Sequence, residues 1–284
     1  MPIYLAVLLG IVEGITEYLP VSSTGHLVLA GHLLGLDDAD PATSSFEIVV
    51  QLGAILAVVA HYRTLLAERL RGLLVRDPAA VRLASALLIA FAPTAAAGLL
   101  LRKTIKAHLF GPLPVATALI VGGAAMILVE RFWVRRSTER DGTSPDPTGH
   151  RRHLKEGLEN VTASRALAIG TAQCLSLWPG TSRAMCTIVA GQLLGLSTGT
   201  AAEFSFLLAL PTLGAATIYE GYKARDILAA NVGAASIAVG LVVSFVVAWI
   251  VIGTFLRYLR TRGLEPFGWY RIVLGALVLW VLGR

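Results

Sequence analysis

The stretch EGITEYLPVSSTGH, residues 13–26, interrupts an apolar segment with ionisable and hydroxyl side chains. Glu13 and Glu17 stand four residues apart and precede a proline, three hydroxyl side chains, a glycine and His26. Proline ends a helix because it lacks an N–H group, and the hydroxyl side chains that follow are good caps for a new helix. The stretch therefore predicts a broken helix with its polar side chains gathered at the break.

The composition around this stretch is that of a membrane protein. Of the 284 residues, 55% are hydrophobic and 15% charged, and the mean hydropathy is +0.70. A soluble domain has about a quarter charged residues. We expect an all-α polytopic membrane protein with one domain, 1–284, and no cleavable signal, because its start lacks a basic region and a cleavage site. The net charge of +6 does not imply a nucleic-acid partner, since membrane proteins are rich in Lys and Arg in their cytoplasmic loops.

Apolar runs define the expected spans, each near the ~20 residues that a bilayer requires. Six runs are long enough, near residues 45–61, 83–101, 113–133, 203–221, 231–256 and 268–283. Two further pieces, near 3–35 and 166–196, are broken by proline and glycine. Broken helices at membrane depth are tolerated only inside protein or beside water, so both pieces are expected as re-entrant hairpins.

The two broken pieces are copies of each other. AGHLLGL at 30–36 and AGQLLGL at 190–196 agree at six of seven positions, and the same offset of 160 aligns Glu13 with Gln173. Three expected spans follow each copy, and because three is odd, the second copy is predicted to be inverted. Inverted repeats place their functional site near the membrane midplane. The predicted organisation is a first repeat, a cytoplasmic loop and a second repeat, at 1–135, 136–164 and 165–284.

Charge predicts the orientation. The loops 62–82, 131–165 and 257–267 share one side and hold 16 Lys and Arg residues, against 6 on the other side. Positively charged loops remain in the cytoplasm. Both termini are therefore expected outside, with the first hairpin entering from the periplasmic or extracellular face of the cell membrane.

Glu13 and Glu17 are the first candidate site. At a spacing of four they lie on one helix face, where like charges repel, and an ionised carboxylate within a membrane is costly enough to indicate function. The pair needs a cation, a shared proton or an opposing arginine. Hard cations such as Mg²⁺ or Ca²⁺ prefer carboxylate and phosphate oxygens. The plain alternative is an interfacial pair that points to water.

The hydroxyl side chains after Pro20 are the second candidate. Ser22, Ser23 or Thr24 can cap the second half-helix, whose free N–H groups form an anion site. His26 follows Ser23 by three residues, so the two are candidates for a nucleophile and its base. A helix cap beside a buried histidine is the alternative.

The second copy supplies an arginine. In WPGTSRAMCT, 178–187, Arg183 takes the position that Ser23 holds in the first copy. A buried arginine at a helix start binds a phosphate or a carboxylate in bidentate fashion. A buried pair with Glu13 or Glu17 is the alternative, and both readings hold if the empty site rests in the paired state. The two copies together predict a phosphate-processing site reached from the lipid.

Other polar residues are weaker candidates. Glu47 and Glu203 each begin a span and are expected to cap it or to line a cavity, as is Gln51, one turn after Glu47. Cys174 and Cys186 match no zinc spacing and are expected to be packing residues.

The first motif, EGITEYLPVSSTGHL, together with PGTSR resembles undecaprenyl-diphosphate phosphatase, the bacitracin-resistance family of membrane phosphatases. The similarity runs essentially end to end and includes FEIVVQLGAILAVV at 46–59 and AEFSFLLALPTLGA at 202–215. The resemblance implies hydrolysis of undecaprenyl diphosphate to undecaprenyl phosphate and inorganic phosphate. This reaction recycles the lipid carrier for peptidoglycan synthesis and confers resistance to bacitracin.

The resemblance also implies roles for particular residues. It implies a divalent cation (Mg²⁺ or Ca²⁺) at Glu13 and Glu17, a Ser23–His26 pair and phosphate binding by Arg183. The further phosphate contacts expected at the two helix starts are Ser22, Thr24, Gly25, Thr181 and Ser182. The family usually has a serine after the arginine, whereas Ala184 stands here, which puts auxiliary phosphate contacts in doubt.

Two functions of different classes remain open at this point. A phosphatase would use the hydroxyl and histidine groups beside the carboxylates, whereas a transporter (flippase) of the same lipid phosphate would need only charge complementarity. The nucleophilic groups favour the phosphatase. The sequence leaves the nucleophile open between serine and water, and it leaves the oligomeric state open, a homodimer included.

Overall fold

The computed structural model describes residues 1–36, 40–109, 111–134 and 156–282. All regular structure in these residues is helical, as expected. The elements are α1 (Ile3–Thr16), α2 (Ser23–Leu33), α3 (Pro41–His61), α4 (Arg63–Leu74), α5 (Pro78–His108), α6 (Pro112–Leu128), η1 (Val129–Val134), η2 (Leu158–Asn160), α8 (Ala163–Gln173), η3 (Cys174–Leu177), α9 (Arg183–Leu193), α10 (Thr198–Lys223), α11 (Arg225–Asn231), α12 (Ala234–Leu259) and α13 (Glu265–Leu282).

Five helices in the described residues are long and apolar enough to cross a membrane. They are Pro41–His61, Pro78–Leu101, Leu113–Val134, Thr198–Lys223 and Ala234–Leu259, and they match five of the six expected spans. The sixth expected span is α13, which is not among the five and carries Glu265 and Arg271 in its first half. The protein is a multi-pass membrane protein. Most of the expected loop 136–164 lies outside the described residues.

Aspartate–proline pairs set the starts of two spans. Asp40 caps α3 by accepting hydrogen bonds from the N–H groups of Ala42 and Thr43, and Pro41 is the first helical residue. Asp77 and Pro78 begin α5 in the same way. Proline suits this position because its N–H would be unpaired and its φ is already helical. Both helices therefore begin before the apolar run does.

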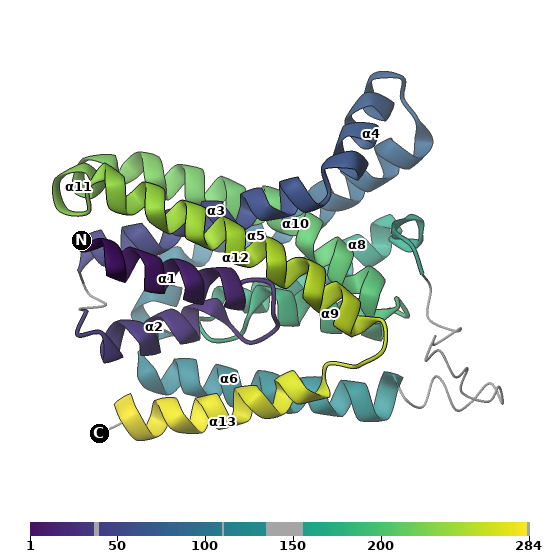
Figure 1. The fold of residues 1–284 in the computed structure, drawn as a ribbon. Helices are drawn as coiled ribbons and strands as arrows, with labels where there is room; N and C mark the ends of the chain where they lie inside the picture. The colour runs from purple at the N-terminus through teal and green to yellow at the C-terminus, as the bar shows by residue number, and fades with distance from the viewer. Residues whose placement is uncertain (37–39, 110, 135–155, 283–284) are drawn as a thin grey trace.

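Each broken piece is a helix, a break and a second helix. α1 and α2 form the first hairpin, while α8, η3 and α9 form the second. α1 packs on α12 and α3, α8 packs on α5, and α6 and α13 lie side by side (Figure 1). The two termini lie at one end of the molecule, and α4 projects from the other (Figure 1). The breaks therefore lie within the helix bundle, whereas the inversion of the second half remains a prediction.

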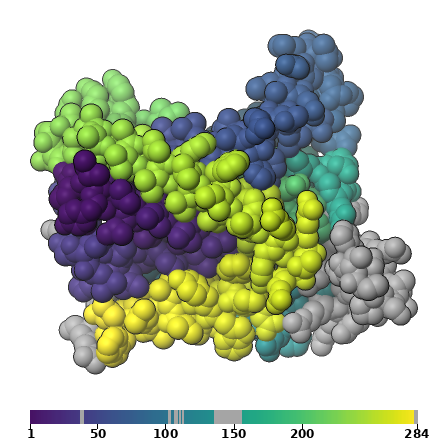
Figure 2. All heavy atoms as spheres, viewed as in Figure 1, coloured from purple at the N-terminus to yellow at the C-terminus, as the bar shows by residue number. Residues whose placement is uncertain are grey.

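The outer face of α12 is apolar where a soluble protein would be polar. Val242, Val246, Trp249 and Ile250 are each at least 45% exposed. α12 crosses the face of the molecule seen in Figure 2, above α1 and α13. Its opposite side packs closely, since a Cβ atom on Gly14 of α1 would lie 2.8 Å from the side chain of Val247. An apolar exterior around a tightly packed interior is the arrangement that lipid requires.

Candidate active site

The two helix breaks share one backbone geometry. Ser22 and Ser182 have φ angles of 75° and 73°, and each side chain accepts a hydrogen bond of 3.3 Å from the N–H three residues later. Positive φ is uncommon outside glycine and persists where the surrounding structure fixes it. Gly35 and Gly195, with φ of 71° and 81°, follow the two helices. The repeat at an offset of 160 is therefore present in the local structure.

Glu17 joins the first break to the second. Its Oε1 accepts hydrogen bonds from Nε and Nη2 of Arg183, at 3.4 and 3.3 Å. Its Oε2 accepts from the Ser23 hydroxyl at 2.7 Å and from Gln51 Nε2 at 3.3 Å. Glu17 and Arg183 are both buried. The alternative of a buried pair with Glu13 or Glu17 is thus present in the structure, with Glu17 as the partner.

Arg183 is held by further groups. Its Nη1 donates to the carbonyl of Ser205 at 2.8 Å and to the hydroxyl of Ser205 at 3.2 Å, and that hydroxyl accepts from Thr187 at 2.6 Å. The guanidinium carbon lies 5.7 Å from the ring centroid of Tyr18, within the range of cation–π attraction. The positive charge is therefore fixed in place before any ligand binds.

Glu13 lies one turn before Glu17 and is 1% exposed. Its Oε1 is buried and has no hydrogen-bond partner among the described residues, which is costly for a carboxylate oxygen. The described residues contain no group of three or more His, Cys, Asp or Glu side chains that could hold a metal. Mg²⁺ is nevertheless held by one or two carboxylates plus substrate phosphates. Glu13 and Glu17 could supply the two carboxylates of such a site, so the divalent cation expected there stays a prediction.

His26 is not paired with Ser23, so the expected contact is wrong for this conformation. Its Nδ1 donates to the carbonyl oxygen of Ser22 at 2.7 Å. Its Nε2 lies 2.6 Å from the hydroxyl of Tyr270 on α13, and the two rings are stacked. A carbonyl oxygen only accepts, so Nδ1 carries a proton and Nε2 of the neutral ring accepts from Tyr270. Both ring nitrogens are thus engaged, and the Ser23 hydroxyl donates to Glu17 instead.

A polar cavity of about 210 Å³ lies between the two breaks. The expected site residues that line it are Glu17, Ser22, Ser23, Thr24, Ser182 and Arg183. Gln51 also lines it, as expected, whereas Glu13, Gly25, His26 and Thr181 are not among its lining residues. The cavity therefore collects hydroxyl groups and the Glu17–Arg183 pair from both hairpins.

Some residues at the site were not expected. Gln173 and Thr94 line the cavity, and Gln173 Nε2 donates to the Thr94 hydroxyl at 2.9 Å. The alignment of Gln173 with Glu13 at the offset of 160 could have indicated that Gln173 lies at the site. No local sequence pattern marks Thr94 or Ser205. Tyr270 was also missed.

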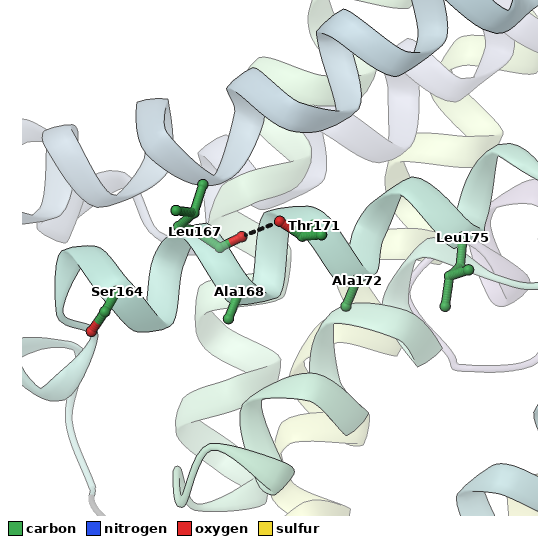
Figure 3. Close-up of a pocket in the computed structure, with 6 residues that line it drawn as sticks. All are labelled: Ser164, Leu167, Ala168, Thr171, Ala172 and Leu175. Carbon is green, nitrogen blue, oxygen red and sulfur yellow. Dashed lines mark hydrogen bonds between the residues drawn. The ribbon is translucent and has the colours of Figure 1, made fainter.

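A second cavity lies on the outer face of α8, with a volume of about 660 Å³ (Figure 3). Its lining residues are Ser164, Leu167, Ala168, Thr171, Ala172 and Leu175. The Thr171 hydroxyl donates to the Leu167 carbonyl of its own helix, so the face offers no charged group and little free polarity. Despite its size, this groove is not a candidate for chemistry on a phosphate.

Comparison with known proteins identifies the family. The family described as bacitracin resistance protein BacA matches residues 6–277. An undecaprenyl-diphosphatase of Sorangium cellulosum is 58% identical over 277 residues, which are 97% of this chain and 85% of that protein. Proteins of the same name from Rhizorhabdus wittichii and Deinococcus radiodurans are 45% and 46% identical, over 98% and 97% of this chain and 97% and 93% of theirs.

Proposed function

The chain belongs to the bacitracin resistance protein BacA family, and we propose that it hydrolyses undecaprenyl diphosphate to undecaprenyl phosphate and inorganic phosphate. The observation that carries the proposal is the buried Glu17–Arg183 pair beside the Ser23 hydroxyl. The relatives are named for the same activity. By this activity the protein would return the lipid carrier to peptidoglycan synthesis and confer resistance to bacitracin.

The pair accounts for how an anion can enter a membrane site. In this structure Glu17 neutralises Arg183 and accepts hydrogen bonds from its Nε and Nη2. A terminal phosphate can take the place of the carboxylate, because a guanidinium binds both in bidentate fashion. Arg183 and the free N–H groups at the starts of α2 and α9 then stabilise the charge that develops on the transferred phosphoryl group.

The Ser23 hydroxyl donates a hydrogen bond to the Glu17 carboxylate, which can therefore act as its general base. In one route Ser23 Oγ attacks the terminal phosphorus, Glu17 takes its proton and undecaprenyl phosphate leaves. Water then hydrolyses the phosphoserine. In the other route Ser23 orients a water molecule that attacks directly. For His26 we retain a proton-carrying role, which would require its Nε2 to exchange Tyr270 for a group of the substrate.

Glu13 and Glu17 are the residues that would hold a divalent cation, Mg²⁺ or Ca²⁺. When bound, such a cation neutralises the negative charge of the diphosphate. The orphaned Oε1 of Glu13 supports this assignment. No observation favours a flippase. A flippase would not need the hydrogen bond between the Ser23 hydroxyl and the Glu17 carboxylate.

The test is phosphate release from undecaprenyl diphosphate by purified protein in detergent. We expect stoichiometric inorganic phosphate and undecaprenyl phosphate, loss of turnover on chelation and recovery on adding Mg²⁺ or Ca²⁺. Failure of the purified protein to release phosphate with either cation would refute the proposed function. Undiminished phosphate release with excess chelator would refute the role of the divalent cation but not the phosphatase activity.

Ser23→Ala distinguishes the two routes. If serine is the nucleophile, we expect turnover to be abolished and wild-type enzyme quenched early in turnover to carry a phosphoserine. If water is the nucleophile, no phosphoserine forms at any time during turnover, and Ser23→Ala retains part of its activity. A fully active Ser23→Ala enzyme would contradict both routes.

Labelling in intact cells tests on which side of the membrane the termini and the opening of the site lie. We propose that both termini lie outside and that the site opens to the periplasmic or extracellular face, as the distribution of Lys and Arg favours. On a background with Cys174 and Cys186 replaced by alanine, Lys223→Cys should react with an impermeant maleimide in intact cells. Glu68→Cys on α4 should react only after lysis. The reverse pattern would invert the topology.

A further inference from the structure

Arg271 is a buried cation that the proposed reaction does not use. It lies in α13, its side chain is 0% exposed, and it is among the largest fully buried side chains. Within the residues that the structure describes, no carboxylate forms an ion pair with it. A charged group at this depth is costly unless it is fully hydrogen-bonded. Its partners therefore indicate what it does.

In the part of the chain that the structure describes, the guanidinium of Arg271 donates to backbone carbonyl oxygens alone. Nη1 donates to Pro20 of the first break at 3.3 Å, and Nη2 donates to Gly180 of the second break at 2.9 Å. Nη2 and Nε also donate to Ala118 and Leu119 of α6, at 3.0 and 3.4 Å. One side chain thus connects both helix breaks to each other and to α6.

The packing around Arg271 leaves a slot for this guanidinium. A Cβ atom on Gly122 of α6 would overlap Nη2 of Arg271 and lie 2.9 Å from Cε of Met185. Both obstacles are the ends of flexible side chains. An alanine at position 122 would therefore displace the guanidinium without forcing the helix backbones apart.

We propose that Arg271 is a positioning residue that fixes the two helix breaks relative to each other, so that Ser23 and Arg183 meet in one site. This inference rests on the proposed phosphatase function. Pro20 precedes Ser23 by three residues, and Gly180 precedes Arg183 by three residues. A displacement of about 1 Å in a catalytic group can cost 10²-fold in rate. Arg271 does not line the cavity, so it acts through these two segments and not on the substrate.

The kinetic test compares Arg271→Lys, Arg271→Met and Gly122→Ala with wild type, at equal amounts of folded protein. We expect each variant to lower kcat about 100-fold and to change KM less than about threefold. Lysine should not rescue, because a single ammonium group cannot reach all four carbonyl oxygens. Gly275→Ala is the packing control, since its Cβ would lie 2.7 Å from Ile120, 2.9 Å from the Ala116 carbonyl oxygen and 3.2 Å from Cβ of Leu119, and so would strain the α6–α13 interface without contacting the guanidinium. It should retain most of its activity.

A second readout does not depend on activity. Hydrogen exchange of peptides that cover residues 17–24 and 177–184 should accelerate at both breaks in the Arg271 variants and in Gly122→Ala, but not in Gly275→Ala. Unchanged exchange at either break would overturn the proposal even if wild type releases no phosphate. The proposal would also be overturned if KM rose in Arg271→Met but stayed near the wild-type value in Arg271→Lys. That pattern would indicate that the positive charge binds the substrate. Equal loss of kcat in Gly275→Ala would assign the effect to helix packing.

Discussion

Replacing Arg183 with alanine is expected to lower kcat/KM about 10³-fold or more. Arginines that stabilise the transferred phosphoryl group contribute on this scale, and here the guanidinium is already fixed by Ser205. The change also leaves the buried carboxylate of Glu17 without its cation, so the folded protein should lose stability. Initial rates of phosphate release over a range of lipid diphosphate concentrations measure the effect.

Arg165→Ala is the control for Arg183. Arg165 lies at the far end of the second hairpin, where it donates to the carbonyls of Leu194 and Asn160. It should retain near-normal turnover. Arg183→Lys should lie between alanine and wild type, because it keeps the charge without the bidentate geometry. A fully active Arg183→Ala enzyme would disprove the phosphate-binding role.

Replacing Glu17 with glutamine is expected to lower kcat about 10³-fold, within the range for loss of a general base. The substitution keeps the shape but removes the charge that faces Ser23 and Arg183. Glu13→Gln should be comparably inactive and should require more Mg²⁺ for half-maximal rate, since its orphaned oxygen is assigned to the cation.

Metal titrations of the two variants, with phosphate release as the readout, test this assignment. Glu203→Gln on α10 is the control, because Glu203 does not line the cavity. It should match wild type in both rate and metal requirement. Near-normal turnover of Glu13→Gln or Glu17→Gln would refute the role of the carboxylate pair.

The breaks could be predicted from the sequence because their causes are local. Proline removes an N–H, serine caps the next turn, and both effects act within a few residues of Pro20 or Pro179. The repeat of the same pattern at an offset of 160 then gave two matched breaks, with nearly equal φ at Ser22 and Ser182. Opposite charges in two apolar segments made a buried pair of Arg183 with Glu13 or Glu17 one of the two interpretations, and the structure shows Glu17 as the partner.

The contacts made by α13 could not be predicted in the same way. Local spacing placed His26 near Ser23, but the ring is held by Tyr270, which is 244 residues away in sequence. Arg271 was a visible signal, a charge within an expected span, yet its partners are backbone carbonyls that carry no side-chain pattern. Ser205 likewise became part of the site only through the packing of α10 on α9.

The central claim is that the two helix breaks form one site, and a double-mutant cycle on Glu17 and Arg183 tests it most directly. The measurement is kcat/KM for Glu17→Gln, Arg183→Gln and the double variant. Residues that act as a unit are strongly non-additive. We expect the double variant to be no more than about tenfold less active than the worse single variant. Losses that multiply would show that the two residues act independently and would contradict the account.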